Sequence, residues 1–504
     1  MNHLSKHTKK VLKAASLLKS FVTPTLGPSG TQVVIFDGYY SSPTKDGVTV
    51  AKKFKHSDPK INAIADVIKQ AATQTNLSQG DGTTTSILLA TSLIEQGISY
   101  SHLSGMPLAT VSRSLKEALP HMLSFIDSHS TPSTPEDLLS IATISSNNDP
   151  VLGKLVYDTF SEVGPEGVIL LEDSPAPFTT SSFTNGYSIS SGYLSPHFIN
   201  SPSTKEVIYE DAVILMTDSK IKSSQEILPF LQYLAQNTKP GIIIADDFDP
   251  QILQMLIVNV INTPLRVTAI KSPSFGENRS LLLQDIAVYT SSKIVSESKG
   301  EFFSSFSPES LGHASKVVIS SDTSTFFCEH NPQIDERIEL INSQIPNLQP
   351  YFQETYRKRA ASLRSKVATI HVGAPSDAER SSTRDRIEDA IRSIRQASLH
   401  GIIPGGGTIP YLLSLTTTFP PLKKALEAPI ELLAYPNQEV VKDVIQRNPL
   451  LGFDALTQEY KDLKQHGIID ATSTLKEALT TAISVASLLI SSHEVITTTP
   501  DESE

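Results

Sequence analysis

The sequence contains one cysteine, Cys328, among 504 residues. A lone thiol excludes an intramolecular disulfide, and it cannot build a zinc site that needs several cysteines. Such sparse cysteine usage is typical of a reducing compartment, so we expect the protein in the cytoplasm.

Positive charge is also in deficit, because 42 Lys and Arg residues stand against 53 Asp and Glu residues, for a formal net charge of −11. DNA and anionic membranes bind cationic surfaces, so we expect no nucleic-acid partner and no membrane partner. Long apolar runs are missing too, which argues against a bilayer-spanning segment. Near the N-terminus, Lys13 and Lys19 interrupt the apolar positions, and this spacing fits an amphipathic helix better than a signal sequence.

The sequence shows no internal repeat, and its length suggests about three domains. Residues 1–130 and 400–495 have helical periodicity, with one strand-like run at residues 31–36. Between residues 185 and 370, short apolar runs such as DAVILMTD and GIIIADD alternate with helical patterns, which is typical of an α/β domain. We therefore predict that the two terminal segments build one mainly helical domain and that the mixed middle is inserted into it.

The stretch SQGDGTTTSILLA, residues 78–90, places Asp81, Gly82 and three threonines directly before a run with helical spacing. One interpretation is a helix N-cap, because Asp and Thr oxygens accept hydrogen bonds from the free amides of a first turn. The other is an anion site, where helix N-terminal amides face a phosphate, Gly82 permits its close approach and Asp81 holds a metal ion. The stretch taken alone favours the cap.

Four further elements have ordinary explanations when each is considered separately. TPTLGPSG at residues 23–30 is explained by a tight turn, and KDG at 45–47 by a hairpin tip. PGGG at 404–407 is explained by a bare loop. The Glu388-Asp389 pair in RDRIEDAIRSIRQ is explained by a solvated helix face with charge pairs four residues apart.

Taken together and in this order, the elements resemble the group I chaperonins, which include the bacterial GroEL type and the heat-shock chaperonins of organelles. The likeness runs nearly end to end. It also includes ATISSNND at 142–149, GYLSPHFIN at 192–200, SFGENRSLLLQDIA at 274–287 and HGIID at 466–470. With DGTTT and TLGP at this separation, the set favours the anion-site interpretation of residues 78–90.

The resemblance implies a multidomain GroEL-like chaperonin fold with a mainly α-helical equatorial domain, a small intermediate domain and an α/β apical domain. The expected ranges are 1–128 and 400–504 for the equatorial domain, 129–184 and 367–399 for the intermediate domain, and 185–366 for the apical domain.

The resemblance also implies an ATP site with Mg²⁺, and with K⁺ as an optional second cation. Asp81 would bind Mg²⁺, Asp389 would act as a further metal ligand and position the attacking water, and Asp46 would assist. The implied nucleotide-binding residues are Thr25, Leu26, Gly27, Pro28, Lys45, Asp81, Gly82, Thr83, Thr84, Thr85, Gly406, Asp454, Ala455 and Asp470. This set suits phosphoryl transfer, which depends on positioning and charge stabilisation.

The apical domain would capture unfolded polypeptides. Its segments SSQEILPFLQYLAQ and DPQILQMLIVNVI read as amphipathic helices, whose apolar stripes usually face a core. The second is apolar over much of its circumference, so part of it is expected to stay exposed as a binding patch. The implied groove residues are Tyr193, Phe198, Leu228, Leu231, Leu253, Ile257 and Val258. The implied partners are unfolded clients, a GroES-type co-chaperonin and further copies of the chain in seven-membered single or double rings.

Several positions depart from the family pattern. Ser29 replaces the lysine of TLGPKG, Asp454-Ala455 replaces an Asn-Ala pair, and His197 stands where a groove tyrosine is usual. Ser365-Lys366 replaces a hinge pair of glycines, and because these residues resist backbone excursions that glycine allows, we expect a stiffer hinge. The departures indicate a diverged copy.

Three hypotheses follow. The first is an ATP-driven folding chaperonin, with catalysis by Asp389 and Asp46. The second is a chaperonin-fold holdase or interaction protein with weak or no ATPase activity, which Ser29, Asp454 and the substituted hinge favour. The third, from the residues alone, is a monomeric metal-dependent nucleotide hydrolase.

Overall fold

The computed structural model describes most of the chain. The described residues are 4–28, 30–36, 41–165, 167–202, 204–296, 307–329, 331–364, 366–449 and 451–496. Ser29 and Ser365, two of the departures from the family pattern, lie outside these residues. Two compact units are present: the N/C unit (Met1–Ser161, Asp173–Thr180 and His371–Glu504) and the central unit (Glu162–Glu172 and Ser181–Ile370). The finer division into three domains stays a prediction.

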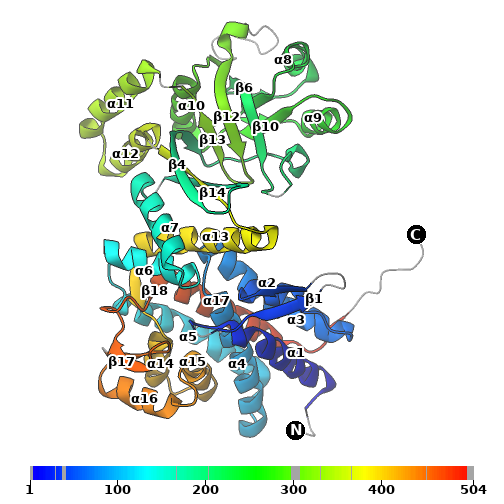
Figure 1. Cartoon of the computed structure of the whole chain (residues 1–504). Helices are drawn as coiled ribbons and strands as arrows, with labels where there is room; N and C mark the ends of the chain where they lie inside the picture. Colours follow the sequence, from blue (N-terminus) through cyan, green and yellow to red (C-terminus); the bar gives the residue numbers. More distant parts are fainter. Residues whose placement is uncertain are drawn as a thin grey trace. The chain divides into compact units, whose positions relative to one another are not determined.

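Long helices form the core of the N/C unit (Figure 1). They are α1 (Lys6–Val22), α3 (Pro59–Gln79), α4 (Thr83–Ser104), α5 (Leu108–His129) and α17 (Thr472–Ser491). Helix α17 packs against α3, α4 and α5, so the end of the sequence is surrounded by its beginning. Leu479, Ala482 and Ala486 of α17 are fully buried, because small and branched apolar side chains on several faces of the helix meet a neighbour.

Helix α17 bears on the expectation that the sequence has no apolar run long enough to span a bilayer. Within the described residues it is long and apolar enough to cross a membrane, by length and composition only. The absence of a long apolar run in the sequence led to the opposite expectation, because threonines and serines interrupt this segment. Of its apolar window, 67% is buried inside the protein, which is the environment of a core helix.

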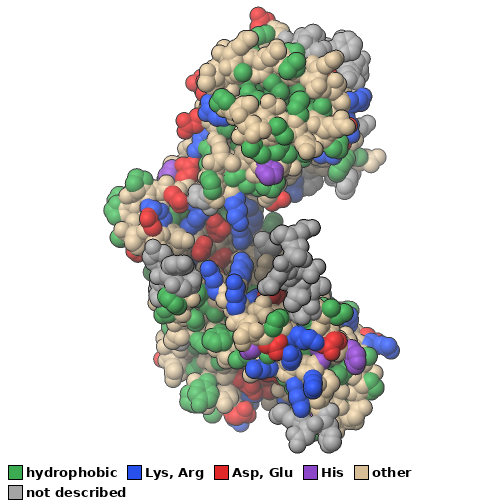
Figure 2. All heavy atoms as spheres, turned by 90° about the vertical axis from the view of Figure 1, so that its right-hand side faces the viewer, with side chains coloured by type: hydrophobic (Ala, Val, Ile, Leu, Met, Phe, Trp, Pro, Cys, Tyr) green, Lys and Arg blue, Asp and Glu red, His purple; other side chains and the backbone are tan. Residues whose placement is uncertain are grey.

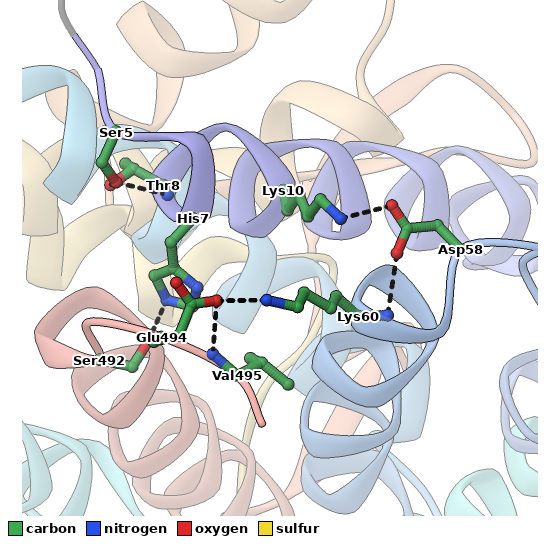
Figure 3. Close-up of polar contacts among 9 residues, drawn as sticks. All are labelled: Ser5, His7, Thr8, Lys10, Asp58, Lys60, Ser492, Glu494 and Val495. Atoms are coloured by element: carbon green, nitrogen blue, oxygen red, sulfur yellow. Dashed lines mark hydrogen bonds and ion pairs between the residues drawn. The ribbon is translucent and has the colours of Figure 1, made fainter. Parts of the chain in front are cut away.

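The two ends of the described chain are joined by polar contacts (Figure 3). His7 Nε2 of α1 lies 2.8 Å from Ser492 Oγ, just after α17. Lys60 Nζ at the start of α3 lies 2.7 Å from Glu494 Oε1, and Lys10 Nζ lies 2.6 Å from Asp58 Oδ2, the N-cap of α3. These contacts fasten the C-terminal segment to the first and third helices.

Further helices and strands surround this core. They are β1 (Val33–Phe36), β2 (Ser41–Thr44), α2 (Gly47–Lys53), α6 (Pro135–Ser145), α7 (Pro150–Val163), α13 (Asp377–His400), β15 (Ile402–Pro404), α14 (Thr408–Thr416), α15 (Pro420–Leu433), α16 (Gln438–Arg447), β16 (Leu451–Asp454), β17 (Glu459–Asp462) and β18 (Ile469–Ala471). The pairs β1–β2, β15–β18 and β16–β17 are antiparallel. The hairpin-tip interpretation of KDG is wrong, because Asp46 is the N-cap of α2.

The central unit is built on a mixed sheet of order β10-β8-β6-β12-β13-β5, with β11 also paired to β6. The strands are β5 (Tyr187–Ile189), β6 (Val207–Thr217), β8 (Gly241–Ala245), β10 (Val267–Lys271), β11 (Ile294–Val295), β12 (Gly312–Ile319) and β13 (Ser324–Phe327). Strands β10, β8 and β6 are parallel, and β8 is buried along its whole length, as expected for the apolar run GIIIA.

Helices flank this sheet. They are α8 (Ser224–Asn237), α9 (Pro250–Asn262), α10 (Gly276–Thr290), α11 (Pro332–Gln344) and α12 (Pro350–Arg364). Figure 1 shows α8 and α9 together at one side of the sheet and α10, α11 and α12 towards the other. The α/β organisation predicted for the middle of the sequence is confirmed.

A small sheet of order β3-β14-β4 lies where the chain passes between the units in sequence. Its strands are β3 (Val168–Asp173), β14 (Lys366–Val372) and β4 (Thr180–Asn185). A Cβ built on Gly186 would overlap the side chain of Val367, so only glycine fits here. Lys366, one of the two residues that replace the expected hinge glycines, forms an ion pair with Glu162 at 2.5 Å.

Candidate functional site

Helix α4 begins without a side-chain cap. Gly82 is its N-cap residue, in a left-handed conformation with φ of 79°. Asp81 Oδ1 accepts a hydrogen bond of 2.5 Å from the Gly82 amide. The first-turn amides that follow have no side-chain acceptor, and the helix dipole adds positive charge at this point. The geometry therefore matches the anion-site interpretation of residues 78–90 better than the N-cap interpretation.

The TLGP and KDG elements both reach this helix start. Thr25 Oγ1 lies 3.3 Å from Thr84 Oγ1, and Thr25 Oγ1 also donates to Val22 O at 2.8 Å. A Cβ built on Gly47 would overlap Thr84 Oγ1, so a glycine is needed for this approach. Gly27 has φ of 74°, and the Gly30 amide donates to Gly27 O at 3.0 Å, which closes a tight turn directly after Leu26.

Helix α13 packs onto the turn between α3 and α4. A Cβ built on Gly80 would lie 2.5 Å from Arg392 Cβ and 3.0 Å from Asp389 O. Arg392 Nη1 also donates to Asn76 O at 3.4 Å. These contacts bring Asp389 to the residues around Asp81, as predicted from motifs more than 300 positions apart.

Asp389 lies in a strongly negative environment. Burial, then the charges of Asp46 and Asp81, raise the pKa of the Asp389 carboxyl to about 8. Asp385, one turn earlier on α13, is also near enough to contribute, and burial raises its own pKa. Charged Asp389 is therefore disfavoured near neutrality until a cation relieves the repulsion.

Asp81 and Asp470 belong to the same group of acids. Asp81 has accessible surface, but the protein around its carboxyl and then the charge of Asp46 raise its pKa, against hydrogen bonds from the Gly82 amide and the Ser145 hydroxyl. Burial, followed by the charge of Asp81, raises the pKa of Asp470 to about 7. Five aspartates thus repel one another around the start of α4: Asp46, Asp81, Asp385, Asp389 and Asp470.

Asp46 already has a structural task. Its Oδ1 accepts from the Val48 amide at 3.0 Å, and its Oδ2 accepts from the amide and hydroxyl of Thr49 at 2.9 and 2.6 Å. The carboxylate can therefore act on its neighbours through charge, whereas both oxygens are engaged at the N-terminus of α2. The adjacent Lys45 is half-buried and forms no ion pair with any described residue.

The PGGG loop lies at the other side of the group. Gly406 has φ of 63°, and a Cβ there would lie 3.4 Å from Phe453 O, next to Asp454 and Ala455. Asp454 is buried, accepts from the Leu456 amide at 2.9 Å and the Thr457 hydroxyl at 2.8 Å, and pairs with Lys461 at 3.1 Å. These contacts lower its pKa against the effect of burial.

Strands β15 and β18 connect this side to Asp470. Ile403 of β15 pairs with Asp470 of β18, and the Gly405 amide donates to Ile468 O at 3.0 Å. The PGGG loop therefore lies next to Phe453, which precedes Asp454, and next to the strand that carries Asp470.

The donor set fits a magnesium ion that is shared with a phosphate. Among the described residues, no three or more His, Cys, Asp or Glu side chains are arranged to hold a metal alone. Mg²⁺ commonly takes one or two carboxylates and completes its shell with phosphates and water. Asp81 is accessible beside amides that lack a side-chain acceptor, so the residues present suit a metal–phosphate pair.

Some of the buried polar atoms without a partner lie in or near these motifs, and others lie elsewhere in the described chain. Those in or near the motifs include Gln79 Oε1, Ser146 Oγ, Thr408 Oγ1 and Thr474 Oγ1, for which no partner is found among the described residues. Thr408 follows PGGG at the start of α14, and Thr474 lies in the first turn of α17; neither helix has a side-chain cap. Buried polar atoms are normally satisfied, so this group indicates a place for water or a ligand.

Several residues of this region could not be predicted from the motifs or were not. Asp385 precedes the predicted Asp389 by four positions on the same helix, and that spacing could have identified it. Ser145 lies within the ATISSNND stretch and hydrogen-bonds Asp81. Thr474 and Arg392 reach the site only through tertiary packing, and no local pattern marks them.

The predicted groove residues of the central unit differ in exposure. Leu228 and Val258 are 50% and 48% exposed, and Tyr193, Leu253 and Ile257 are half-buried against the core. Phe198 and Leu231 are buried, with exposures of 1% and 7%, although Phe198 also lines the pocket described below; that they belong to a client-binding groove stays a prediction. The apolar stripe of α8 turns Leu231 to the sheet, and Phe198 anchors the segment after β5 in the same core.

A pocket lies beside α9. It has a volume of ≈ 340 Å³ and is lined by residues of the 196–200 segment and of the C-terminal end of α9 and the following loop, among them His197, Phe198, Ile261 and Arg266. Ile261 is 60% exposed. Hydrophobic side chains are spread over the face of the central unit in Figure 2, which turns the α8–α9 side towards the viewer.

Known proteins share this fold. The model of the TCP-1/cpn60 chaperonin family matches residues 18–500. The structure is similar to that of the chaperonin gp146 from the bacteriophage EL 2 (Pseudomonas aeruginosa), solved in the presence of ATP-BeFx in two crystal forms. Form II has 22% sequence identity, 97% coverage of each chain and a TM-score of 0.75; form I has 22% identity, 99% coverage of each chain and a TM-score of 0.68. Because the family model spans nearly the whole sequence, the chain belongs to the TCP-1/cpn60 chaperonin family.

Proposed function

We propose that this chain is an ATP-dependent molecular chaperone that hydrolyses ATP in the N/C unit and captures non-native polypeptides on the α8–α9 face of the central unit. The observation that carries the proposal is the meeting of Asp389 and Asp81 beside the uncapped start of α4. The related phage chaperonin was solved with ATP-BeFx, which supports a nucleotide at this site.

Each residue of the site has a physical role in this proposal. Amides of Thr83, Thr84 and Thr85 bind phosphate oxygens at the positive end of the helix dipole. Mg²⁺, when bound, would neutralise phosphate charge, and Asp81 would hold it. Asp389 orients the attacking water and accepts its proton, which suits a carboxyl whose pKa of about 8 lies near neutral pH. Asp46 tunes Asp389 through its charge.

Clients would bind the exposed apolar side chains of α8 and α9. Leu228, Val258 and Ile261 each have about half or more of their surface accessible. Covering one such side chain contributes up to about 1.5–3 kcal/mol, and the attraction has no directional requirement. A face of this kind suits many unfolded sequences.

The remaining partners are proposed from the family resemblance. They are a GroES-type co-chaperonin that competes for the same apolar face and further copies of the chain in seven-membered rings. A cytoplasmic location and K⁺ as a second cation belong to the same proposal.

ATP turnover tests the central step. We compare steady-state hydrolysis by the wild type and by Asp389→Asn, which keeps the shape of the side chain and removes its basicity. The expected result is a loss of at least about 100-fold with nucleotide binding retained. Equal turnover by the two proteins, or none by the wild type, would contradict an ATPase with Asp389 at its centre.

A second candidate function is a holdase with weak or no ATPase activity. The observation in its favour is that Lys366 forms an ion pair with Glu162 at a position where a glycine would permit hinge motion. A stiff hinge uncouples hydrolysis from release of a client. Rapid ATP-dependent refolding of a client that cannot fold unaided would exclude this candidate.

A further inference from the structure

Thr474 carries a buried hydroxyl with no partner. The residue is 8% exposed, and its Oγ1 makes no hydrogen bond within the described part of the chain. An unsatisfied buried hydroxyl destabilises a protein, and a valine of the same shape would avoid the loss. A threonine at this position therefore needs a partner that binds it, either water or a ligand.

The helix itself cannot supply that partner. Threonines inside a helix usually donate to the carbonyl four residues earlier. For Thr474 that carbonyl belongs to Asp470, which lies in strand β18 rather than in α17. Thr481, two turns later on the same face of α17, is equally buried but donates to Glu477 O at 2.9 Å and lies 3.2 Å from Thr75 Oγ1.

The side chain that carries this hydroxyl contacts the start of α4. A Cβ built on Gly82 would lie 2.6 Å from Thr474 Cγ2, so the side chain of Thr474 packs directly on the N-cap of the uncapped helix. Its Oγ1 is attached to the same Cβ as this methyl group. Gln79, three residues before Gly82 in the sequence, has a second buried oxygen without a partner among the described residues.

We propose that Thr474 is a further nucleotide-binding residue, whose hydroxyl donates a hydrogen bond to a phosphate oxygen of a bound nucleoside di- or triphosphate. This inference rests on the proposed function of the site. It extends the phosphate contacts from the first turn of α4 to the first turn of α17, so that the beginning and the end of the sequence bind the same group.

The test compares Thr474→Val with the matched control Thr481→Val in the full chain. Calorimetric titration with Mg·ADP gives the affinity, and thermal unfolding without ligand gives the stability. Thr474→Val is expected to weaken binding about tenfold, because a hydrogen bond to a charged group is lost, while its unliganded Tm stays equal or rises. Thr481→Val is expected to keep the affinity and lower the Tm, because it loses satisfied hydrogen bonds.

The remaining outcomes also decide for or against the inference. If Thr474→Val binds Mg·ADP as the wild type does, water satisfies the hydroxyl and the nucleotide does not. If Thr474→Val loses both affinity and Tm, Thr474→Ser decides: it keeps the hydroxyl, so retained affinity supports the inference and lost affinity assigns the effect to methyl packing. If the wild type itself does not bind Mg·ADP, the proposed function fails and this inference fails with it, whereas equal binding by wild type and Thr474→Val removes the inference alone.

Discussion

Glu388 and Asp389 are neighbours in one motif on α13, but their side chains have different surroundings. Glu388 lies 3.4 Å from Arg384 and 3.5 Å from Arg392, so it forms the charge pairs expected of a solvated face. Asp389, 100° further around the helix, faces Asp46 and Asp81 instead. The solvated-face interpretation therefore describes Glu388, and the functional interpretation suits Asp389.

Asp389 makes the unliganded protein sensitive to alkali. Its pKa is raised from 3.8 to about 8 in the folded chain, so between these values the folded state keeps a proton that the unfolded state has released. Stability must then fall as the pH rises through this window. Asp389→Asn removes the effect, and we expect its Tm advantage over the wild type to grow from about pH 5 to about pH 8.

Thermal unfolding without nucleotide or Mg²⁺ measures this difference. Glu388→Gln is the matched control, because it removes a neighbouring charge that lies in ion pairs and should show no growing advantage. If the Tm of the wild type and the Tm of Asp389→Asn change equally between about pH 5 and about pH 8, the pKa of Asp389 is not raised in the folded chain.

A residue of the candidate site could be predicted from the sequence where it belongs to a motif. It could not be predicted where only tertiary packing brings it to the site. Asp81 and Asp389 could be named from DGTTT and from the family resemblance, and the fold brings them together. Thr474 could not, because its position at Gly82 depends on how α17 docks against α4. The 1% exposure of Phe198 could not be predicted either, because a sequence does not tell which side of a short segment meets a core.

At the scale of elements, the beginning of α4 depends on a backbone conformation that only glycine adopts easily. Gly82 has φ of 79°, and an added Cβ would lie 2.6 Å from Thr474 Cγ2. Gly82→Ala combines left-handed strain, about 1–2 kcal/mol, with this clash, so we expect the free energy of unfolding to fall by more than about 2 kcal/mol.

Gly105 offers a matched control at the other end of α4. Its φ is 74°, and an added Cβ would meet nothing within 4 Å. Gly105→Ala should therefore cost the backbone strain alone, about 1–2 kcal/mol. Denaturant unfolding of both variants checks the comparison, and equal losses would show that Thr474 does not pack against Gly82.

Substitutions of exposed residues on the α8–α9 face should affect client binding, and substitutions of buried residues should affect stability. Leu228 and Val258 are about half exposed, so Leu228→Ser with Val258→Ser should reduce capture of a chemically unfolded client while the Tm changes little. Phe198→Ala should instead destabilise the central unit by about 3–5 kcal/mol, because Phe198 is 1% exposed. Client capture is measured by suppression of aggregation; unchanged capture by the double variant would place the client site elsewhere.

Helices and strands with a clear pattern of apolar residues could be predicted from the sequence. A helix whose start depends on one capping side chain could not. The buried strands β8 and β10 and the helices α4 and α17 follow from their apolar runs. Helix α2 did not, because Asp-Gly is typical of a hairpin tip and only the capping bonds of Asp46 to Val48 and Thr49 start a helix there.

At the scale of the whole molecule, the sequence begins and ends in the same unit. Helix α17 lies among α3, α4 and α5, and the His7–Ser492 and Lys60–Glu494 contacts hold the segment after it (Figure 3). The insertion of an α/β middle could be inferred because helical and mixed patterns change along the chain. The boundaries of three domains remain a prediction.

Ring assembly is the prediction at this scale. Native mass spectrometry of the purified chain should show a species of about seven or fourteen times 54.7 kDa. A species of one chain mass, with and without Mg·ATP, would favour the monomeric nucleotide hydrolase over a chaperonin ring.

The most direct test of the account is a calorimetric titration of the wild type and of Asp81→Asn with ADP, each with and without Mg²⁺. The wild type is expected to bind one nucleotide per chain, more tightly with Mg²⁺ than without, and Asp81→Asn is expected to lose that magnesium dependence. Absence of binding by the wild type, or an Asp81→Asn variant with the same magnesium dependence, would contradict the claim that these distant segments form a magnesium–nucleotide site.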